Sequence, residues 1–343
     1  MIGKKRSSIA APRLLKSGRA GNAGMIASFA IAFAGVVAGA MSAYFSEQGA
    51  AARAARDQAP SAGIEDRSSA EAGVSARDRI VQAVLADAAL ERLSAPGAAP
   101  RDYPDPPRII VVIDDLGLDR AMAERFIALP GPLTLSFLPY ARNVGALADK
   151  ADAAGADVML HLPMEPLGEA DPGPNALRLG MTGAEFLSNL EWNLSRFDGY
   201  VGVNNHMGSR LTADQAAMET VLAYLKAQGL FFLDSVTTAQ TQARAAAAAV
   251  GAHMVERDVF LDARTGDAAY VKAQLEIAER IALETGYAVV IGHPYETTLE
   301  ALGPWLTTAP ARGFEITAIS ALIDEERRGA ADPVFAERPA LRL

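Results

Sequence analysis

Polar residues of the kinds that bind metals and transfer protons stand at or near the ends of apolar runs in this 343-residue chain. The runs RIIVVID, DVMLHL, YVGVNN, LFFLDS, HMVERDVFL and YAVVIGH carry, in that order, Asp114-Asp115, His161, Asn204-Asn205-His206, Asp234-Ser235, Arg257-Asp258 and His293. One such ending means little, because every strand stops at something polar. Six in one chain predict a shared site if the runs are parallel strands, whose carboxyl ends meet on one face.

The chemistry open to this set is metal-assisted hydrolysis. The chain has no cysteine, so a tightly bound transition metal would take imidazole and carboxylate ligands. One aspartate and two histidines, with a fourth position open to water, form a typical catalytic zinc set. Such a metal lowers the pKa of its water from about 15.7 to about 7 and polarises a carbonyl. His293, on another run, could protonate a leaving amine or stabilise an oxyanion.

Asp114 and Asp115 cannot both reach one point from a regular strand, since neighbouring side chains point to opposite faces. A twist or bulge at the end of the strand would bring them to the same side. We therefore expect one carboxylate to bind the metal and the other to lie near the water as general base.

The elements that position these residues alternate between strands and helices from Arg108 onward. Strands are predicted at 108–114, 133–139, 157–162, 200–205, 230–235, 253–261, 287–293 and 315–320. Helices are predicted at 119–128, 143–154, 183–197, 212–228, 267–285 and 297–312. Several strands are apolar on both faces, as in a parallel sheet covered by helices. This pattern predicts an α/β fold, and seven or eight strand–helix units suit a (β/α) barrel better than an open sheet.

The motifs IDDLG, LHLPME, GVNNHMGS, FLDS, RDVFLD and IGHP follow one another between about residues 106 and 324. In this order they resemble the divergent polysaccharide deacetylase family, which is related to the NodB-type carbohydrate esterases. The resemblance implies a distorted (β/α) barrel with a divalent metal, zinc being the expected one. It also implies hydrolysis of N-acetyl groups on the amino sugars of chitin-like or peptidoglycan polymers.

The resemblance implies a role for each of the first motif residues. Asp114 resembles the catalytic base of a paired-aspartate motif, and Asp115 resembles its metal ligand. His161 stands where the first metal histidine is expected. Glu165 occupies the position of the second histidine, which is a departure from the NodB pattern. His206 is the imidazole expected to take its place as the third ligand.

The later motifs supply further expected roles. Asp234 resembles the acidic residue near the catalytic centre, and His293 resembles the general acid. A group expected to support the ligands or to touch substrate comprises Glu165, Asn204, Asn205, Ser235, Arg257 and Asp258.

Each of these residues could instead have a purely structural role. The pair Asp114-Asp115 could form a turn or cap before the helix near Asp119. His161 could be an ordinary buried histidine. The remaining structural roles are a hydrogen bond from His206 to Asn204 or Asn205, a helix cap at Asp234-Ser235, an ion pair between Arg257 and Asp258, and a hydrogen bond accepted by Glu165.

The beginning of the chain predicts a membrane anchor. Residues 1–23 carry six basic and no acidic residues, and residues 24–45 carry no charge. As a helix, the uncharged segment would span roughly 33 Å, against roughly 30 Å of hydrocarbon. The basic leader predicts a single-pass protein of a bacterial inner membrane with its C-terminal domain in the periplasm. Alternatively, the segment could be cleaved as a signal peptide.

The remaining organisation follows from composition. An Ala- and Pro-rich stalk with one candidate helix is expected over 46–107, the barrel domain over 108–323, and a loose tail over 324–343. Half of the residues are hydrophobic, which excludes disorder throughout. Beyond the basic leader the chain has a net charge of about −15, which disfavours nucleic acid as a partner.

Two functions of different classes remain. The first is a membrane-tethered metal hydrolase acting on a glycan, either peptidoglycan or another N-acetylated polysaccharide of the envelope. The second is a protein on the same fold that binds glycan or an envelope protein partner without turnover. The rim of acids and histidines favours the enzyme, whereas Glu165 favours the binder or a changed substrate. A phosphoesterase is a weaker third hypothesis, because few cations other than Arg210 and Arg257 lie near the motifs.

Overall fold

The structure is a computed structural model that describes residues 105–328, with side chains as far as Asp324. The expected leader, membrane anchor and nearly all of the expected stalk lie outside these residues. Among the described helices, none combines the length and the apolar character that a membrane span requires.

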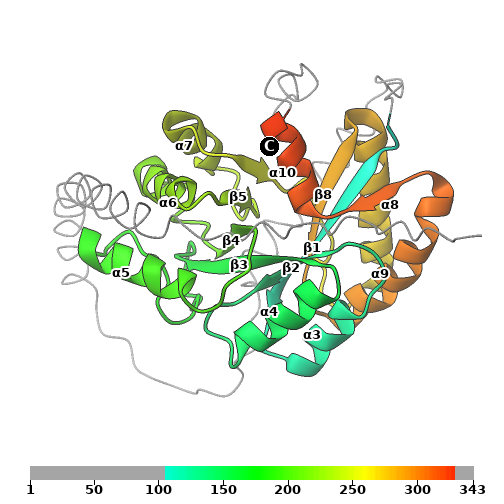
Figure 1. Ribbon diagram of the computed structural model, residues 1–343, viewed down its shortest axis with the longest axis horizontal. Helices are drawn as coiled ribbons and strands as arrows, with labels where there is room; N and C mark the ends of the chain where they lie inside the picture. The colour runs from blue at the N-terminus through cyan, green and yellow to red at the C-terminus, as the bar shows by residue number, and fades with distance from the viewer. Residues whose placement is uncertain (1–104, 329–343) are drawn as a thin grey trace, which may run out of the picture.

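A curved sheet of nine parallel strands forms the centre of the fold (Figure 1). The strands are β1 (Arg108–Leu116), β2 (Thr134–Phe137), β3 (Asp157–Met164), β4 (Gly202–Met207), β5 (Phe231–Asp234), β6 (Met254–Glu256), β7 (Val259–Phe260), β8 (Tyr287–Gly292) and β9 (Glu315–Thr317). They lie in the order β6-β5-β4-β3-β2-β1-β8-β7, and β9 pairs with β1. Since all the pairs are parallel, the carboxyl ends of the strands share one edge of the sheet.

Helices between the strands cover the outer face of the sheet (Figure 1). They are α3 (Arg120–Ile127), α4 (Val144–Ala153), α5 (Gly183–Leu194), α6 (Gln215–Ala227), α7 (Ala243–Val250), α8 (Ala268–Thr285) and α9 (Glu296–Thr308). Alternate residues of β1 divide between the two faces. Ile109, Val111 and Ile113 pack in the large core beneath these helices, because successive side chains of a strand point to opposite sides.

The inner face of the sheet is covered by the last helix, α10 (Ile319–Arg328). Ile110 and Val112 of β1 share a buried cluster with Ile319 and Leu322 of this helix, together with residues of β5 and β8. Figure 1 shows α10, in red, lying between β5 and β8. A helix thus fills the concave side of the sheet, where a closed barrel would have interlocking strand side chains.

The expected barrel is therefore only partly correct. The predicted parallel α/β architecture is present, but among the described residues β6 and β7 end the strand order without pairing with each other. The run HMVERDVFL forms these two short strands instead of one. At the break, the backbone N–H of Arg257 donates to Asp234 of β5, and that of Asp258 donates to Val289 of β8. The two residues between β6 and β7 therefore bond to β5 on one side and to β8 on the other.

Two helices differ from the sequence prediction. α7 was not expected, because its sequence ARAAAAAV lacks the large apolar residues that mark an amphipathic helix. α10 was not expected either, because a strand is predicted over 315–320 and a loose tail from Asp324, whereas the strand ends at Thr317 and the chain is helical from Ile319 to Arg328. Ile319, Leu322 and Ile323 are buried at helical spacing, and their packing anchors the charged turn that follows. The rest of the expected tail lies outside the described residues.

Candidate metal centre

The paired aspartates reach the same side of the sheet because β1 is irregular near its end. The register with β2 shifts between Ile113 and Leu116, and Asp115 has a left-handed φ of 57°. This is the kind of bulge that adjacent carboxylates need in order to converge. The pair does not cap α3, because Asp119 does so by accepting a hydrogen bond of 3.0 Å from the backbone N–H of Met122.

Asp115, His161 and His206 form a buried cluster in the carboxyl-terminal halves of β1, β3 and β4, and β3 continues past His161 to Met164. The Oδ1 atom of Asp115 lies 3.1 Å from Nε2 of His161 and 2.7 Å from Nδ1 of His206. The three ligand atoms all lie within 4.8 Å of one another. These are the three residues that the sequence predicted as a metal set, and the fold brings them together.

The cluster has a feature that fits a cation. Asp115 Oδ1 is buried and accepts no hydrogen bond, although two imidazole nitrogens lie close to it. Leaving a buried carboxylate oxygen unsatisfied is unfavourable unless an ion or donor compensates. Burial raises the pKa of Asp115, but the nearby His206, His161 and His293 outweigh it and hold that pKa well below its usual value. The carboxylate is therefore in the charged form that a metal ligand needs.

Asp114 lies beside this cluster and has its own set of partners. Its Oδ1 accepts a hydrogen bond of 2.7 Å from Asn204 Nδ2, and its Oδ2 accepts one of 3.4 Å from Ser235 Oγ. The Oδ2 atom is 3.8 Å from His161 Nε2. Burial is the main cause that raises the pKa of Asp114, against the opposing effect of His161 and His293. A buried carboxylate with a raised pKa next to this candidate metal site is suited to accept a proton.

His293 forms a buried pair with Asp262, a residue that the sequence analysis did not single out. Nδ1 of His293 lies 2.9 Å from Oδ1 of Asp262. The second carboxylate oxygen accepts hydrogen bonds from the His293 backbone N–H at 2.6 Å and from Thr298 Oγ1 at 2.8 Å. His293 Nε2 is 4.0 Å from Asp115 Oδ2, so the free edge of the ring faces the cluster.

The protonation of His293 follows from these surroundings. Burial lowers its pKa, but the carboxylates of Asp262, Asp115 and Asp114 raise it more, to about 9. The ring is therefore an imidazolium at neutral pH. Asp262 stands in the motif RDVFLD, just after β7, at the same kind of strand end as the predicted site residues. That placement is the signal in the sequence, but a single predicted strand over 253–261 hides it, because the structure has two short strands, β6 and β7, in that run.

Asp234, expected to be catalytic, does not reach the cluster. Its Oδ1 accepts a hydrogen bond from the Val236 backbone N–H at 2.8 Å, and its Oδ2 accepts one from Thr241 Oγ1 at 2.7 Å. Val236 has a left-handed φ of 49°, which is rare and strained for a β-branched residue. Asp234 thus holds the turn that presents Ser235 to Asp114. It does not cap α7, whose N-cap residue is Gln242.

Arg257 supports the same turn. Its Nε donates to the carbonyl of Ser235 at 2.8 Å, and its Nη2 donates to that of Val236 at 3.0 Å. Asn205 adds a third tie, because its Oδ1 accepts a hydrogen bond of 2.8 Å from the Ser235 backbone N–H. Asp258 is turned toward β8, where its Oδ2 accepts a hydrogen bond from the Val289 backbone N–H at 2.8 Å.

Glu165 is not part of the cluster. Its Oε2 accepts a hydrogen bond of 2.8 Å from the Leu179 backbone N–H, and its Oε1 lies 3.5 Å from Arg210 Nη1. Its backbone N–H donates to the carbonyl of Leu177. Glu165 therefore fastens the long loop between β3 and α5, and it does not take the place of the absent metal histidine.

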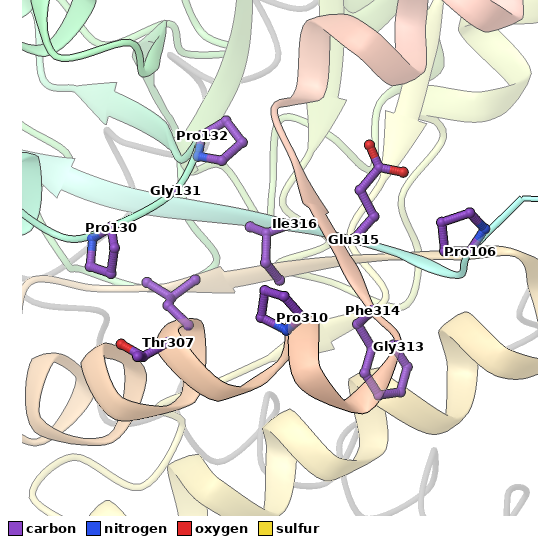
Figure 2. Close-up of a pocket in the computed structure, with 11 residues that line it drawn as sticks. Pro106, Pro130, Gly131, Pro132, Thr307, Pro310, Gly313, Phe314, Glu315 and Ile316 are labelled. Atoms are coloured by element: carbon purple, nitrogen blue, oxygen red, sulfur yellow. The ribbon is translucent and has the colours of Figure 1, made fainter.

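A hollow of about 670 Å³ lies at the opposite end of the sheet (Figure 2). It is lined by Pro106 before β1, by the loop Pro130–Pro132 before β2, and by the segment that leads into β9. Among the described residues that line it, only Glu315 is ionisable. Since the carboxylates and histidines gather at the carboxyl ends of the strands, this hollow is separate from the candidate site.

Comparison with known proteins places the domain in a family. A family model described as divergent polysaccharide deacetylase matches residues 111–323. The uncharacterized protein YibQ of Escherichia coli strain K12 is 33% identical over 250 residues, which are 73% of this chain and 76% of YibQ. An uncharacterized protein of Haemophilus influenzae is 31% identical over 203 residues, which are 59% of this chain and 72% of that protein.

A solved structure has a similar fold. The crystal structure of the uncharacterized protein ATU2773 from Agrobacterium tumefaciens C58 matches with a TM-score of 0.62 and 30% sequence identity. The match covers 68% of this chain and 94% of that one.

Proposed function

This chain belongs to the divergent polysaccharide deacetylase family, and we propose that it is a metal-dependent hydrolase that removes N-acetyl groups from an amino-sugar polymer of the cell envelope. The observation that carries the proposal is the unsatisfied Asp115 Oδ1 between the two imidazoles of His161 and His206. The amide bond and the glycan are proposed from the family name and from the acid–base groups beside this cluster.

Asp115, His161 and His206 would hold the metal. A divalent cation bound there supplies a Lewis acid that makes a water more acidic and polarises a carbonyl. Carboxylate and imidazole ligands suit zinc, which is the metal we propose.

Asp114 and His293 would move the protons. The Asp114 carboxylate accepts a proton as water oxygen attacks the acetyl carbon. His293, whose protonated form is favoured by the neighbouring Asp262 carboxylate, would donate a proton from Nε2 to the amide nitrogen as the C–N bond breaks. The products are acetate and a free amine on the sugar. Asp262 keeps the donor in place by binding Nδ1.

The aromatic rings beside His293 would form part of the wall around the substrate. The Phe260 ring lies 5.1 Å from the imidazole, and the Tyr295 ring is stacked against it at 5.8 Å. Burial of His293 between them restricts water, which strengthens the electrostatic interactions in the site.

We also propose that the protein is held in a bacterial inner membrane by residues 24–45, with the hydrolase domain in the periplasm. The support for this is the uncharged segment after a basic leader. A periplasmic location would place the domain next to peptidoglycan. An envelope protein could bind the expected stalk, and the acidic chain disfavours nucleic acid.

A glycan-binding protein without turnover is the second candidate, and the observation that favours it is Glu165 in place of a metal histidine. Measurement of acetate released from acetylated amino-sugar oligomers by the purified full-length protein separates the two. We expect release that stops when a chelator removes the metal and returns when zinc is added. Binding of the oligomers without acetate release, with zinc present, would favour the second candidate.

A further inference from the structure

The amide of Asn204 lies at the junction of four strands or their ends. The residue is fully buried in β4, and its backbone is in register with His161 of β3. Its side chain contacts Ser136 of β2, Asp114 of β1 and Ser235 after β5. Its neighbour Asn205 differs, because its side chain bonds to the backbone at Met207 and Ser235. Asn204 is therefore the amide that connects side chains of the candidate site.

All four hydrogen-bonding positions of this amide are used. Oδ1 accepts from Ser136 Oγ at 2.5 Å and faces Nδ1 of His161 at 2.9 Å. Nδ2 donates to Asp114 Oδ1 at 2.7 Å and to Ser235 Oγ at 3.2 Å. An amide offers two donors and two good acceptor positions, so no capacity is left over.

The neighbours also fix which way the amide points. A flipped amide would place Oδ1 against the Asp114 carboxylate, and two acceptors at that distance repel each other. Oδ1 must therefore face His161, and the proton between them belongs to Nδ1 of the imidazole. Nε2 of His161, 3.1 Å from Asp115 Oδ1, is then the ring nitrogen that can bind a metal shared with that carboxylate.

We propose that Asn204 is a positioning residue that serves both halves of the site with one amide. Through Oδ1 it holds His161 as the Nδ1–H tautomer, with Nε2 ready to bind a metal. Through Nδ2 it fixes Oδ1 of Asp114, so that Oδ2 is the oxygen turned toward His161 and the reacting water. The inference rests on the proposed function, because it assigns a purpose to the metal ligand and the base.

Two substitutions separate the two tasks. Asn204→Ala removes both, and we expect zinc affinity to fall roughly 10- to 100-fold, as is typical when a partner behind a metal histidine is lost. Asn204→Asp keeps an acceptor for the His161 Nδ1–H but places a carboxylate against Asp114. We expect this variant to bind zinc within about threefold of the native protein while acetate release falls by about tenfold or more.

The control is Asn193→Ala. Asn193 is a buried amide of α5 that donates to the carbonyls of Asn175 and Asn189, away from the site. The Asn193→Ala variant shows how the loss of a buried amide outside the site affects the protein. We expect its zinc affinity to match that of the native protein.

The experiment measures zinc affinity by competition with a chromophoric chelator, and the His161 ring proton by NMR of protein labelled with ¹⁵N-histidine. In the zinc-loaded native protein we expect a slowly exchanging proton on Nδ1 of His161, retained in Asn204→Asp. A purely structural role for Asn204 would not produce this split between zinc affinity and turnover.

The outcomes distinguish this inference from the proposed function. If Asn204→Ala binds zinc as tightly as the native protein and keeps the Nδ1 proton, the inference is wrong and the hydrolase proposal stands. If Asn204→Ala does not fold, a loss of zinc affinity in folded Asn204→Asp would overturn the inference. If zinc affinity falls in Asn204→Ala and is kept in Asn204→Asp, but the native protein releases no acetate, the role of Asn204 in holding His161 stands and the hydrolase proposal fails. Failure of the native protein to bind zinc would overturn both.

Discussion

The imidazole of His293 and the carboxylate of Asp262 form a buried pair, with Nδ1 of the ring 2.9 Å from Oδ1 of the acid. The second oxygen of Asp262 receives the backbone N–H of His293 itself, so one carboxylate fixes both the position and the charge of the ring. This pair connects the residue after β8 to the loop that follows β7.

The charge of this pair gives a pH dependence that can be measured in the metal-free protein. The pKa of His293 is raised from 6.5 to about 9 in the folded state. Between these values the folded protein holds a proton that the unfolded chain has released. The stabilising contribution is therefore complete below about pH 6.5 and is lost as the pH rises through 9.

Asp262→Asn should remove most of this dependence, because an amide can still accept from the backbone N–H but no longer favours the imidazolium. The measurement is the free energy of unfolding in urea between pH 6 and 10 for both proteins. We expect the stability of the native protein to fall more steeply with pH than that of the variant. Parallel curves would contradict the assigned charge of His293.

Asp114→Asn should abolish turnover while leaving zinc bound. The substitution removes the proton acceptor, and general-base catalysis contributes roughly 10²- to 10⁴-fold to the rate. Acetate release and zinc content are measured on the same preparation. Asp119→Asn is the matched control, because Asn also caps a helix and Asp119 lies outside the cluster. A loss of zinc together with activity in Asp114→Asn would mean that Asp114 is a ligand.

Glu165→Ala should weaken the fold and spare the metal. The carboxylate accepts a hydrogen bond from Leu179 in a mostly buried setting, so we expect a loss of about 1–2 kcal/mol in the free energy of unfolding. Glu165→Gln keeps an acceptor and should lose less. Urea unfolding and zinc analysis of the two variants check this, and a fall in zinc content would restore Glu165 as a candidate ligand.

Leu322→Ala tests the role of α10 as the cover of the inner sheet face. Leu322 is fully buried against residues of β1, β5 and β8, so its truncation should lower the free energy of unfolding by about 2–5 kcal/mol. Leu283→Ala on the exposed side of α8 is the control and should change it by less than about 0.5 kcal/mol. Equal small effects would show that α10 is not part of the cooperative fold.

The sequence was sufficient for the features that depend on local pattern. Apolar strands alternating with helices predicted the parallel sheet, and parallel strands necessarily bring Asp115, His161 and His206 to one edge. The bulge that unites Asp114 and Asp115 was anticipated as a requirement, although its backbone conformation could be seen only in the structure.

The features that escaped prediction depend on long-range packing. β6 and β7 come from one short run of residues, 253–261, but β6 pairs with β5 and β7 pairs with β8, so the sheet stays open between them. α10 is held in place by apolar contacts with strands that are far away in the chain. Asp234 illustrates the same limit. Its position at a strand end resembled that of a catalytic acid, but its oxygens are used by Val236 and Thr241, seven or fewer residues ahead.

The most direct test of the central claim is the zinc content of the purified full-length protein after exposure to zinc and removal of the excess. Native protein and His161→Ala, His206→Ala and His253→Ala variants are compared, His253 being an exposed histidine outside the cluster. We predict about one zinc per chain in the native protein and in His253→Ala, and far less in His161→Ala and His206→Ala. A native protein that retains no zinc, or His161→Ala and His206→Ala variants that retain as much as the native protein, would contradict the assignment of Asp115, His161 and His206 as a metal centre.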